Sequence, residues 1–369
     1  MIRADKAEKF LLYFSATLTV TAAVLGLGLA ALITLVLVRN FRNLVQASEA
    51  VEAGRLDVEV PVETTDEVGR LAASFNNMVG GLRMKERIKD TFGKYMDPRI
   101  VARLVENPEF TRLGGERREM TIMFIDLERY TSIAERLSPE DLVRMLNLFL
   151  AHMTDAIAAN RGVVNDFQGD AVMAYWGPPF TEPHEHAALA CKTALDASRN
   201  FERFRAEVAA ELGERSVGAQ LGMRIGISSG DVVSGNIGSA ATRKFSVVGD
   251  PVNLGSRLEG ANKNYGTGFI LSERTRELLG HANHARELDL IRVKGKSMPT
   301  RIFELLDAPP PLSPFGDGLA ACRRQDWAAA EAAFLSCRTV APDDPVPAVF
   351  LERIAYLREN PPGPDWDGV

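Results

Sequence analysis

The 369-residue sequence has little cysteine and no excess of positive charge. Its three cysteines, Cys191, Cys322 and Cys337, have neither paired nor metal-ligand spacing, which excludes a disulfide framework and favours a reducing compartment. The chain carries 43 Lys and Arg against 49 Asp and Glu, a formal net charge of −6, so we expect no nucleic-acid partner. The hydrophobic content of 46% is typical of globular proteins, and the length predicts two or three domains.

Charged residues are absent from residues 10–38. A helix over this run would be about 43 Å long, whereas the hydrocarbon layer of a bilayer is roughly 30 Å thick. The run is too long for the apolar part of a signal peptide, and no small-residue cleavage site follows it. We therefore predict a transmembrane helix at residues 10–38. Because only nine residues precede it, we expect no sensor domain on the far side of the membrane.

Residues 39–90 show two helical patterns around an extended connector. Gly54 is expected to end the first helix, and Thr64 with Glu67 forms a capping-box pattern at the start of the second. In the second helix, apolar residues recur at spacings of 3, 4, 3 and 4, which indicates a coiled-coil seam that needs a partner helix: Val68, Leu71, Phe75, Met78 and Leu82.

With Asp66-Glu67-Val68-Gly69 opening the second helix, this segment resembles a HAMP domain. The resemblance implies a parallel coiled-coil dimer that relays signals from the membrane. The alternative is a plain coiled-coil stalk, and both interpretations imply a homodimer.

Residues 91–307 alternate helical and extended patterns, which predicts an α+β fold with helices against an antiparallel-rich sheet. We expect strands at residues 121–125, 163–167, 171–176, 217–228, 232–236, 287–294 and 300–305, with Gly230-Asp231 as a hairpin turn. Asp126 ends the first strand, and Asp170 lies in the turn between the next two. Two carboxylates at adjacent strand ends can share divalent cations, although either one alone is more often a turn former.

Two further groups could contact a nucleotide. Asn253 and Arg257 are four residues apart and share one helix face, where they could hold a ribose and a phosphoryl transition state. Lys294 adds a cation near a strand end. Backbone amides of residues 127–131, which include Tyr130 and Thr131, could cradle a polyphosphate. Taken singly, Arg257 and Lys294 read as solvated surface charges.

Jointly, four motifs resemble the class III nucleotidyl cyclase catalytic domain: Met123-Phe124-Ile125-Asp126, Gln168-Gly169-Asp170, the run from Val248 to Glu259, and Val293-Lys294-Gly295-Lys296. The resemblance implies a ferredoxin-like βαββαβ core and sites formed between two catalytic domains, each with two Mg²⁺ or Mn²⁺ ions. It assigns the metals to Asp126, Asp170 and the Ile125 carbonyl. It assigns ribose orientation and transition-state stabilisation to Asn253 and Arg257, and the terminal phosphates to Lys294.

The purine-binding positions depart from this family pattern. Adenylate-forming members usually have a lysine four residues before the second metal aspartate, and this sequence has Asp166 there, with Ser246 at the partner position. An ionised carboxylate only accepts hydrogen bonds, which weakens the assignment of ATP. Ser246 resembles the small hydroxyl of many bacterial adenylate cyclases. ATP is therefore the expected substrate, with GTP, or a degenerate domain that only senses nucleotides, as alternatives.

Pro309-Pro310-Pro311 marks a boundary before a helical tail at residues 314–360. Within it, the pattern from Gly318 to Phe334 resembles one tetratricopeptide-like repeat. A lone repeat cannot bury its apolar face, so we expect the tail to pack on the cyclase domain or to bind a partner protein, unless it is only a helical cap. Because the expected substrate is a nucleoside triphosphate, we place the catalytic domain in the cytoplasm of a single-pass inner-membrane protein.

Overall fold

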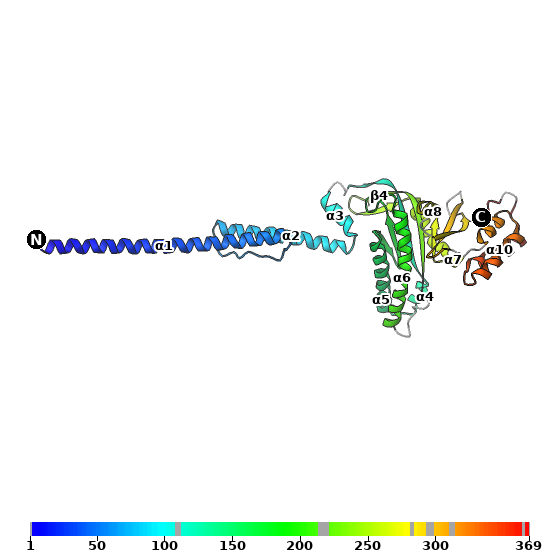
Figure 1. Cartoon of the computed structure of the whole chain (residues 1–369), viewed down its shortest axis with the longest axis horizontal. Coiled ribbons are helices and arrows are strands. Elements are labelled where there is room, and N and C mark those ends of the chain that lie inside the picture. The colour runs from blue at the N-terminus through cyan, green and yellow to red at the C-terminus, as the bar shows by residue number, and fades with distance from the viewer. Residues whose placement is uncertain are drawn as a thin grey trace. The chain divides into compact units, whose positions relative to one another are not determined.

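The computed structural model describes residues 2–107, 112–212, 221–280, 284–292, 299–309, 314–363 and 366–368. It divides into two compact units, Met1–Val101 and Ala102–Val369 (Figure 1). Helix α3 (Pro98–Glu106) straddles the boundary between them.

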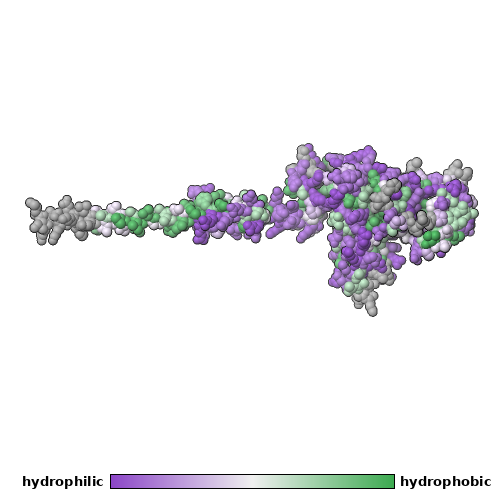
Figure 2. Space-filling view, viewed as in Figure 1, coloured by the Kyte–Doolittle hydropathy of each residue, from purple (hydrophilic) through white to green (hydrophobic). Residues whose placement is uncertain are grey.

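The first unit begins with the long helix α1 (Ile2–Glu52), which contains the predicted transmembrane run. From Phe14 onward this helix is long and apolar enough to cross a membrane. Its large apolar side chains are exposed, with Leu27 at 72% and Leu35 at 68% (green in Figure 2). An apolar surface on all sides of a helix is stable in lipid rather than in water, so α1 fits a transmembrane segment.

The second helix of this unit, α2 (Glu67–Gly93), begins at a cap that differs from the predicted one. Asp66, not Thr64, is the N-cap residue, and its carboxylate accepts hydrogen bonds from the backbone N–H of Val68 and Gly69. Thr64 instead donates its hydroxyl to Asp66. Gly69 is required because a Cβ there would lie 1.7 Å from the Thr64 carbonyl oxygen. The Asp-Glu-Val-Gly motif is thus a single compact helix start.

Side chains of α2 hold the extended connector that precedes it. The Asn76 amide bonds both the N–H and the C=O of Val60, at 2.9 and 2.8 Å. Arg83 donates to the carbonyls of Leu56 and Val58. These bonds satisfy backbone groups that have no strand partner.

The predicted seam on α2 separates into two faces. Phe75 is buried, together with Ala72 and Val79, in a small core with Ala47 of α1 and Val60 of the connector. The residues Leu71, Met78 and Leu82 stay exposed, at 48%, 52% and 38%. Phe75 therefore contributes to packing within the chain, whereas the other three form an apolar face that nothing in this unit covers.

The second unit is built on one eight-stranded sheet. Its strands are β1 (Gly114–Glu128), β2 (Val163–Gln168), β3 (Ala171–Trp176), β4 (Gly222–Gly238), β5 (Arg243–Val248), β6 (Phe269–Ser272), β7 (His284–Ile291) and β8 (Thr300–Leu306). The order is β2-β3-β1-β4-β6-β8-β7, and β5 pairs with β4. Strands β1 to β4 and the helices between them form the predicted βαββαβ core, antiparallel at each contact.

The predicted hairpin at Gly230-Asp231 is wrong. Strand β4 runs without a break from Gly222 to Gly238, and Met120 and Glu119 of β1 pair with Gly230 and Asp231. The reason is that β1 is 15 residues long, so it continues to offer pairing partners beyond the Gly-Asp dipeptide. Residues 217–220 and 293–294 of the predicted strands lie outside the described residues, and β6 was not predicted.

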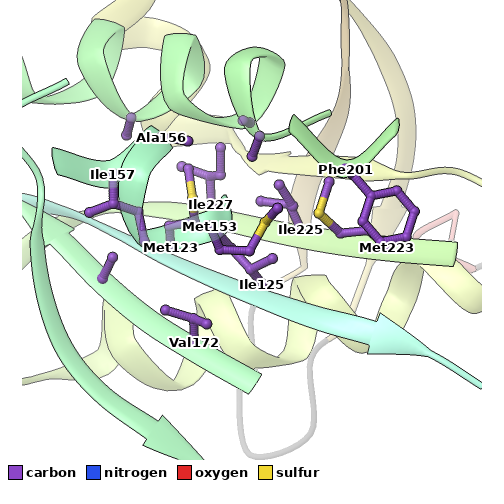
Figure 3. Packing of buried hydrophobic residues seen from close by; sticks show 14 of the residues in the cluster. Met123, Ile125, Met153, Ala156, Ile157, Val172, Phe201, Met223, Ile225 and Ile227 are labelled. Carbon is purple, nitrogen blue, oxygen red and sulfur yellow. The ribbon is translucent and has the colours of Figure 1, made fainter. Parts of the chain in front are cut away.

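Helices cover both faces of the sheet. On one face, α5 (Pro139–Ala159) and α6 (His186–Leu212) pack in the larger core (Figure 3), where Met153 and Ile157 meet Met123, Ile125 and Val172. Helix α5 also has the length and composition of a membrane span, but its apolar side belongs to this core. Three short or amphipathic helices complete the catalytic part: α4 (Tyr130–Ala134), α7 (Asp250–Tyr265) and α8 (Glu273–Leu279).

The tail folds as three helices, α9 (Phe315–Arg323), α10 (Trp327–Val340) and α11 (Val346–Glu359), within the helical tail predicted at residues 314–360. Their buried faces share a second core with α7 and with β6, β7 and β8. The tail therefore packs on the catalytic part, as one of the alternatives predicted. Its resemblance to a tetratricopeptide repeat stays a prediction.

The uncovered face of α2 leads to a first prediction. Replacing Leu71 or Met78 by Glu would place a carboxylate without a counter-charge against a partner helix, which should weaken self-association by roughly 3 kcal/mol. Chemical cross-linking of the full chain in membranes measures the loss of dimer. Asn77→Glu adds the same charge at an exposed polar position of α2 and should leave the dimer intact. Equal cross-linking of all three variants would contradict a dimer contact through Leu71 and Met78.

Candidate active site

Strand pairing brings Asp126 and Asp170 together. Ile125 of β1 pairs with Val172 of β3, so Asp126 lies next to the β2–β3 turn that carries Asp170. The pKa of Asp170 is raised to about 6, first by burial and second by the negative charge of Asp126, while a hydrogen bond with the Leu127 backbone opposes the shift. The two carboxylates therefore lie close enough to repel each other, as carboxylates that share a cation do.

A buried arginine that the sequence analysis missed lies between two acidic side chains. Arg224 of β4 is the cross-strand partner of Asp126, and its guanidinium donates to that carboxylate at 3.0 Å. It also forms an ion pair with Glu259 of α7 at 3.0 Å. The side chains of Asp126, Arg224 and Glu259 are only 22%, 17% and 15% exposed. A lone arginine within the apolar run from Met223 to Ile227 was the signal that an acidic partner faces it.

Glu259 adds negative charge to this cluster. Its pKa is raised to about 7, first by burial and second by the negative charge of Asp126, while Arg224 acts in the opposite direction. Asp126 and Glu259 thus flank one guanidinium, and Asp170 adds a third carboxyl group beside Asp126, which leaves the cluster short of positive charge. Such a cluster favours the binding of cations.

The donor set fits divalent cations that also bind a substrate. Across the residues that the structure describes, no group of three or more His, Cys, Asp or Glu side chains could hold a metal alone. Mg²⁺ is usually held by one or two protein carboxylates, with substrate phosphates and waters completing the shell. Asp126 and Asp170 meet that requirement, and the predicted ligand Ile125 lies in β1 directly before Asp126.

Asn253 and Arg257 lie on the exposed face of α7, whereas Leu254 and Leu258 on the other side are buried. Helix α7 lies very close to the sheet. A Cβ on Gly226 of β4 would come within 2.2 Å of the Gly255 carbonyl oxygen and of the Glu259 nitrogen. Glycine at position 226 therefore allows the close approach that brings Glu259 to Arg224.

The predicted purine-binding positions have neighbours that the sequence did not indicate. Lys244 of β5 forms an ion pair with Asp166 at 2.9 Å, and both side chains are nearly half exposed. Ser246, two residues further along β5, donates its hydroxyl to the side-chain oxygen of Asn165 at 2.9 Å. A β-bulge between Val164 and Asp166 allows both Asn165 and Asp166 to reach β5. The result is a small polar surface made of an amide, a hydroxyl and a paired lysine and carboxylate.

The remaining predicted site residues are Tyr130, Thr131 and Lys294, and the first two come shortly after β1 in the sequence. Arg129 adopts a left-handed conformation, with φ of 68°, and so turns the chain from β1 into α4. Tyr130 and Thr131 are the first two residues of α4, close in sequence to Asp126. Lys294 lies outside the described residues.

Comparison with known proteins matches two parts of the chain to families. Residues 115–305 match the adenylate and guanylate cyclase catalytic domain, and residues 32–84 match the HAMP domain. For the fold, a solved bacterial light-regulated adenylyl cyclase aligns with a TM-score of 0.54 at 22% identity, covering 67% of each chain.

Two curated relatives extend the similarity. Adenylate cyclase 1 of Rhizobium meliloti is 30% identical over 293 residues, which are 79% of this chain and 42% of the relative. An uncharacterised protein of Mycobacterium tuberculosis is 33% identical over 260 residues, which are 70% of this chain and 43% of that protein. The chain thus spans less than half the length of either relative. The catalytic-domain match covers more than half of this chain. The chain therefore belongs to the adenylate and guanylate cyclase family, as a class III nucleotidyl cyclase that also carries a HAMP domain.

Proposed function

We propose that this chain is an adenylate cyclase that converts ATP to 3′,5′-cyclic AMP and pyrophosphate at two sites shared between identical subunits. One observation carries the proposal: Asp126 and Asp170 lie together, whereas Asn253 and Arg257 lie on the exposed face of α7. We propose that these two pairs are the two halves of a shared site.

The geometry of α7 supports sharing between subunits. Glu259 faces Asp126 of its own chain through Arg224. At about 100° of rotation per residue, Arg257 and Asn253 lie about 160° and 120° around the helix from Glu259. They therefore point away from the aspartates of their own chain, and we propose that they serve the aspartates of a second copy.

The reaction is the attack of the ribose 3′-oxygen on the α-phosphorus, with pyrophosphate as the leaving group. In the proposed site, Asn253 orients the ribose and Arg257 neutralises charge that develops on the phosphoryl oxygens. Lys294 binds the terminal phosphates, and the chain at Tyr130 and Thr131 lies beside them. Positioning and charge stabilisation supply most of the acceleration in such a phosphoryl transfer.

We propose that Asp126 and Asp170, with the Ile125 carbonyl, hold two Mg²⁺ or Mn²⁺ ions. These ions would supply charge neutralisation at the phosphates and activation of the attacking oxygen. Arg224 holds the Asp126 carboxylate in place through its Oδ2 atom.

The neighbours of Asp166 support ATP as the substrate. An unpaired carboxylate at this position would accept hydrogen bonds from the N–H groups of guanine. Lys244 neutralises Asp166 and brings an ammonium donor to the place where adenylate-forming members usually carry their lysine. An ammonium can donate to a ring nitrogen of adenine, and the Asn165–Ser246 pair offers further polar groups.

We propose that residues 10–38 anchor the protein in the inner membrane as a single span and that residues 39–90 relay a signal to the cyclase domain at residues 91–307. The cyclase domain would lie in the cytoplasm, where ATP is available. The buried Phe75 and the exposed Leu71 on α2 support a relay in which packing within and between chains changes together. The variant Leu71→Glu should therefore lower cyclase activity in membranes as well as dimerisation.

Mixed dimers test the shared sites. Asp126→Ala and Arg257→Ala should each abolish cyclic AMP formation, because each removes one half of both sites in a homodimer. Co-expression of the two full-length variants should restore roughly a quarter of wild-type activity, since half of randomly paired dimers are mixed and each has one intact site of two. Cyclic AMP is measured in membranes at equal protein amounts.

Two outcomes would contradict this arrangement. Wild-type turnover by Asp126→Ala alone would exclude its role with the metals. No recovery in the mixed sample, with tagged pull-down confirming mixed dimers, would show that each site lies within one chain. Lys263→Ala, which removes another cation from α7, should keep full activity and serves as the matched control.

A nucleotide panel tests the substrate. We expect the wild type to prefer ATP over GTP with either Mg²⁺ or Mn²⁺. Lys244→Ala should lower kcat/KM for ATP about tenfold, the effect of losing one hydrogen bond to a charged donor, and change that for GTP much less. Arg243→Ala removes a cation from the opposite face of β5. It should leave unchanged the ratio of kcat/KM for ATP to kcat/KM for GTP. A wild-type preference for GTP would reassign the substrate but not the family.

A further inference from the structure

The C-terminal helices form part of the core around α7. The match to the cyclase catalytic domain ends at residue 305, before α9 begins. Nevertheless Leu254 and Leu258 of α7 share one buried core with residues of all three tail helices, among them Phe315, Phe334 and Phe350. The rings of Phe334 and Phe350 stack at 4.8 Å, and Phe315 meets both of them edge-on. The tail therefore completes the core of the inner side of α7, together with β6, β7 and β8.

A buried carboxylate joins the last residue of α7 to the last helix of the tail. Asp289 of β7 is only 4% exposed. Its Oδ2 accepts a hydrogen bond from the Tyr265 hydroxyl at 2.6 Å and another from the Arg353 guanidinium at 2.6 Å. Arg353 also lies over the ring of Phe350, at 4.8 Å from its centroid. Because a buried carboxylate needs these partners, the three side chains fix the end of α7 against α11.

A second set of contacts lies beside the first. The C-cap of α7, Gly266, lies against Pro345, which directly precedes α11. Asp344 of the same loop pairs with Arg286 of β7, which also pairs with Glu304 of β8 at 2.6 Å. Arg286, Asp344 and Glu304 are all about 15% exposed or less. The sheet and the tail thus hold α7 from two sides at its C-terminal end.

We propose that the tail is a positioning element of the cyclase site, in which Tyr265, Asp289 and Arg353 fix α7 so that Asn253 and Arg257 keep their place in the partner's site. The inference rests on the proposed function, because α7 acts on the site of the other subunit. Asn253 and Tyr265 are 12 residues apart, or about 18 Å along one rigid helix. A tilt at Tyr265 therefore moves Asn253 and Arg257 directly, whereas it reaches Asp126 only through Glu259 and Arg224.

The experiment uses the mixed dimers of full-length chains described above. In the pair of Asp126→Ala with Arg257→Ala, the one live site takes its α7 from the Asp126→Ala subunit. Adding Arg353→Met to that subunit should lower kcat about tenfold while changing KM for ATP less than about twofold, since misplacing a group used in the transition state acts mainly on kcat. Adding Arg353→Met to the other subunit, whose α7 lacks Arg257, should lower kcat less than about twofold, because that α7 reaches the live site only through Glu259, Arg224 and Asp126.

Matched variants separate positioning from general damage. Arg358→Met, on the same helix, removes an exposed ion pair with Glu331 inside the tail. It should leave the activity of the starting pair unchanged, whichever subunit carries it. Tyr265→Phe keeps the ring beside Phe350 but removes the hydroxyl. It should lower kcat less than Arg353→Met does, and again mainly when the Asp126→Ala subunit carries it.

Equal loss of activity from Arg353→Met on either subunit, or no loss on either, would overturn the proposal. No activity in the starting pair, before any tail substitution, would instead overturn the shared site, so the two failures are distinguishable.

Discussion

The pairing of β1 on both of its edges is the constraint on which the catalytic part depends. On one edge, the register with β3 places the Asp170 turn beside Asp126. On the other edge, the register with β4 sets Arg224 directly opposite Asp126. A shift of either ladder by one residue would send Asp126 into the apolar core and Ile125 or Leu127 out of it. The core residues on alternate positions of β1 therefore hold the acidic cluster as firmly as its own ion pairs do.

Charge explains why this cluster is suited to a phosphate substrate. Arg224 neutralises part of the charge of Asp126 and Glu259, so Asp126 keeps a defined position in the free protein. The neutralisation is incomplete, because one guanidinium faces two carboxyl groups and Asp170 adds a third beside Asp126. In the proposed function, metal ions provide the missing positive charge. Arg224 also ties Asp126 to α7, and in the proposed homodimer α7 serves the other site. Under that proposal, each chain links the two sites through one partly buried guanidinium.

Sequence patterns correctly predicted the structural elements that depend on the local spacing of apolar and turn residues. The β2–β3 hairpin and the helical tail follow local turn signals and periodicity, and both are present. The Gly230-Asp231 hairpin failed because pairing with a distant strand overrode a local turn signal. Phe75 was assigned to the same seam as Leu71 because heptad spacing does not say which neighbour lies within the chain. Lys244 and Arg224 were missed for a related reason: their partners are 78 and 98 residues away, and only the fold brings them together.

The limit of the catalytic unit is set by packing rather than by motifs. The family pattern ends near β8, yet the core on the apolar side of α7 also includes residues that follow, from all three tail helices. Without α9 to α11, this core would lose Phe315, Phe334 and Phe350, and Asp289 would lose Arg353. A cyclase domain that ended at residue 307 would therefore lack part of the support of the helix that carries Asn253 and Arg257, and its turnover would understate that of the whole chain.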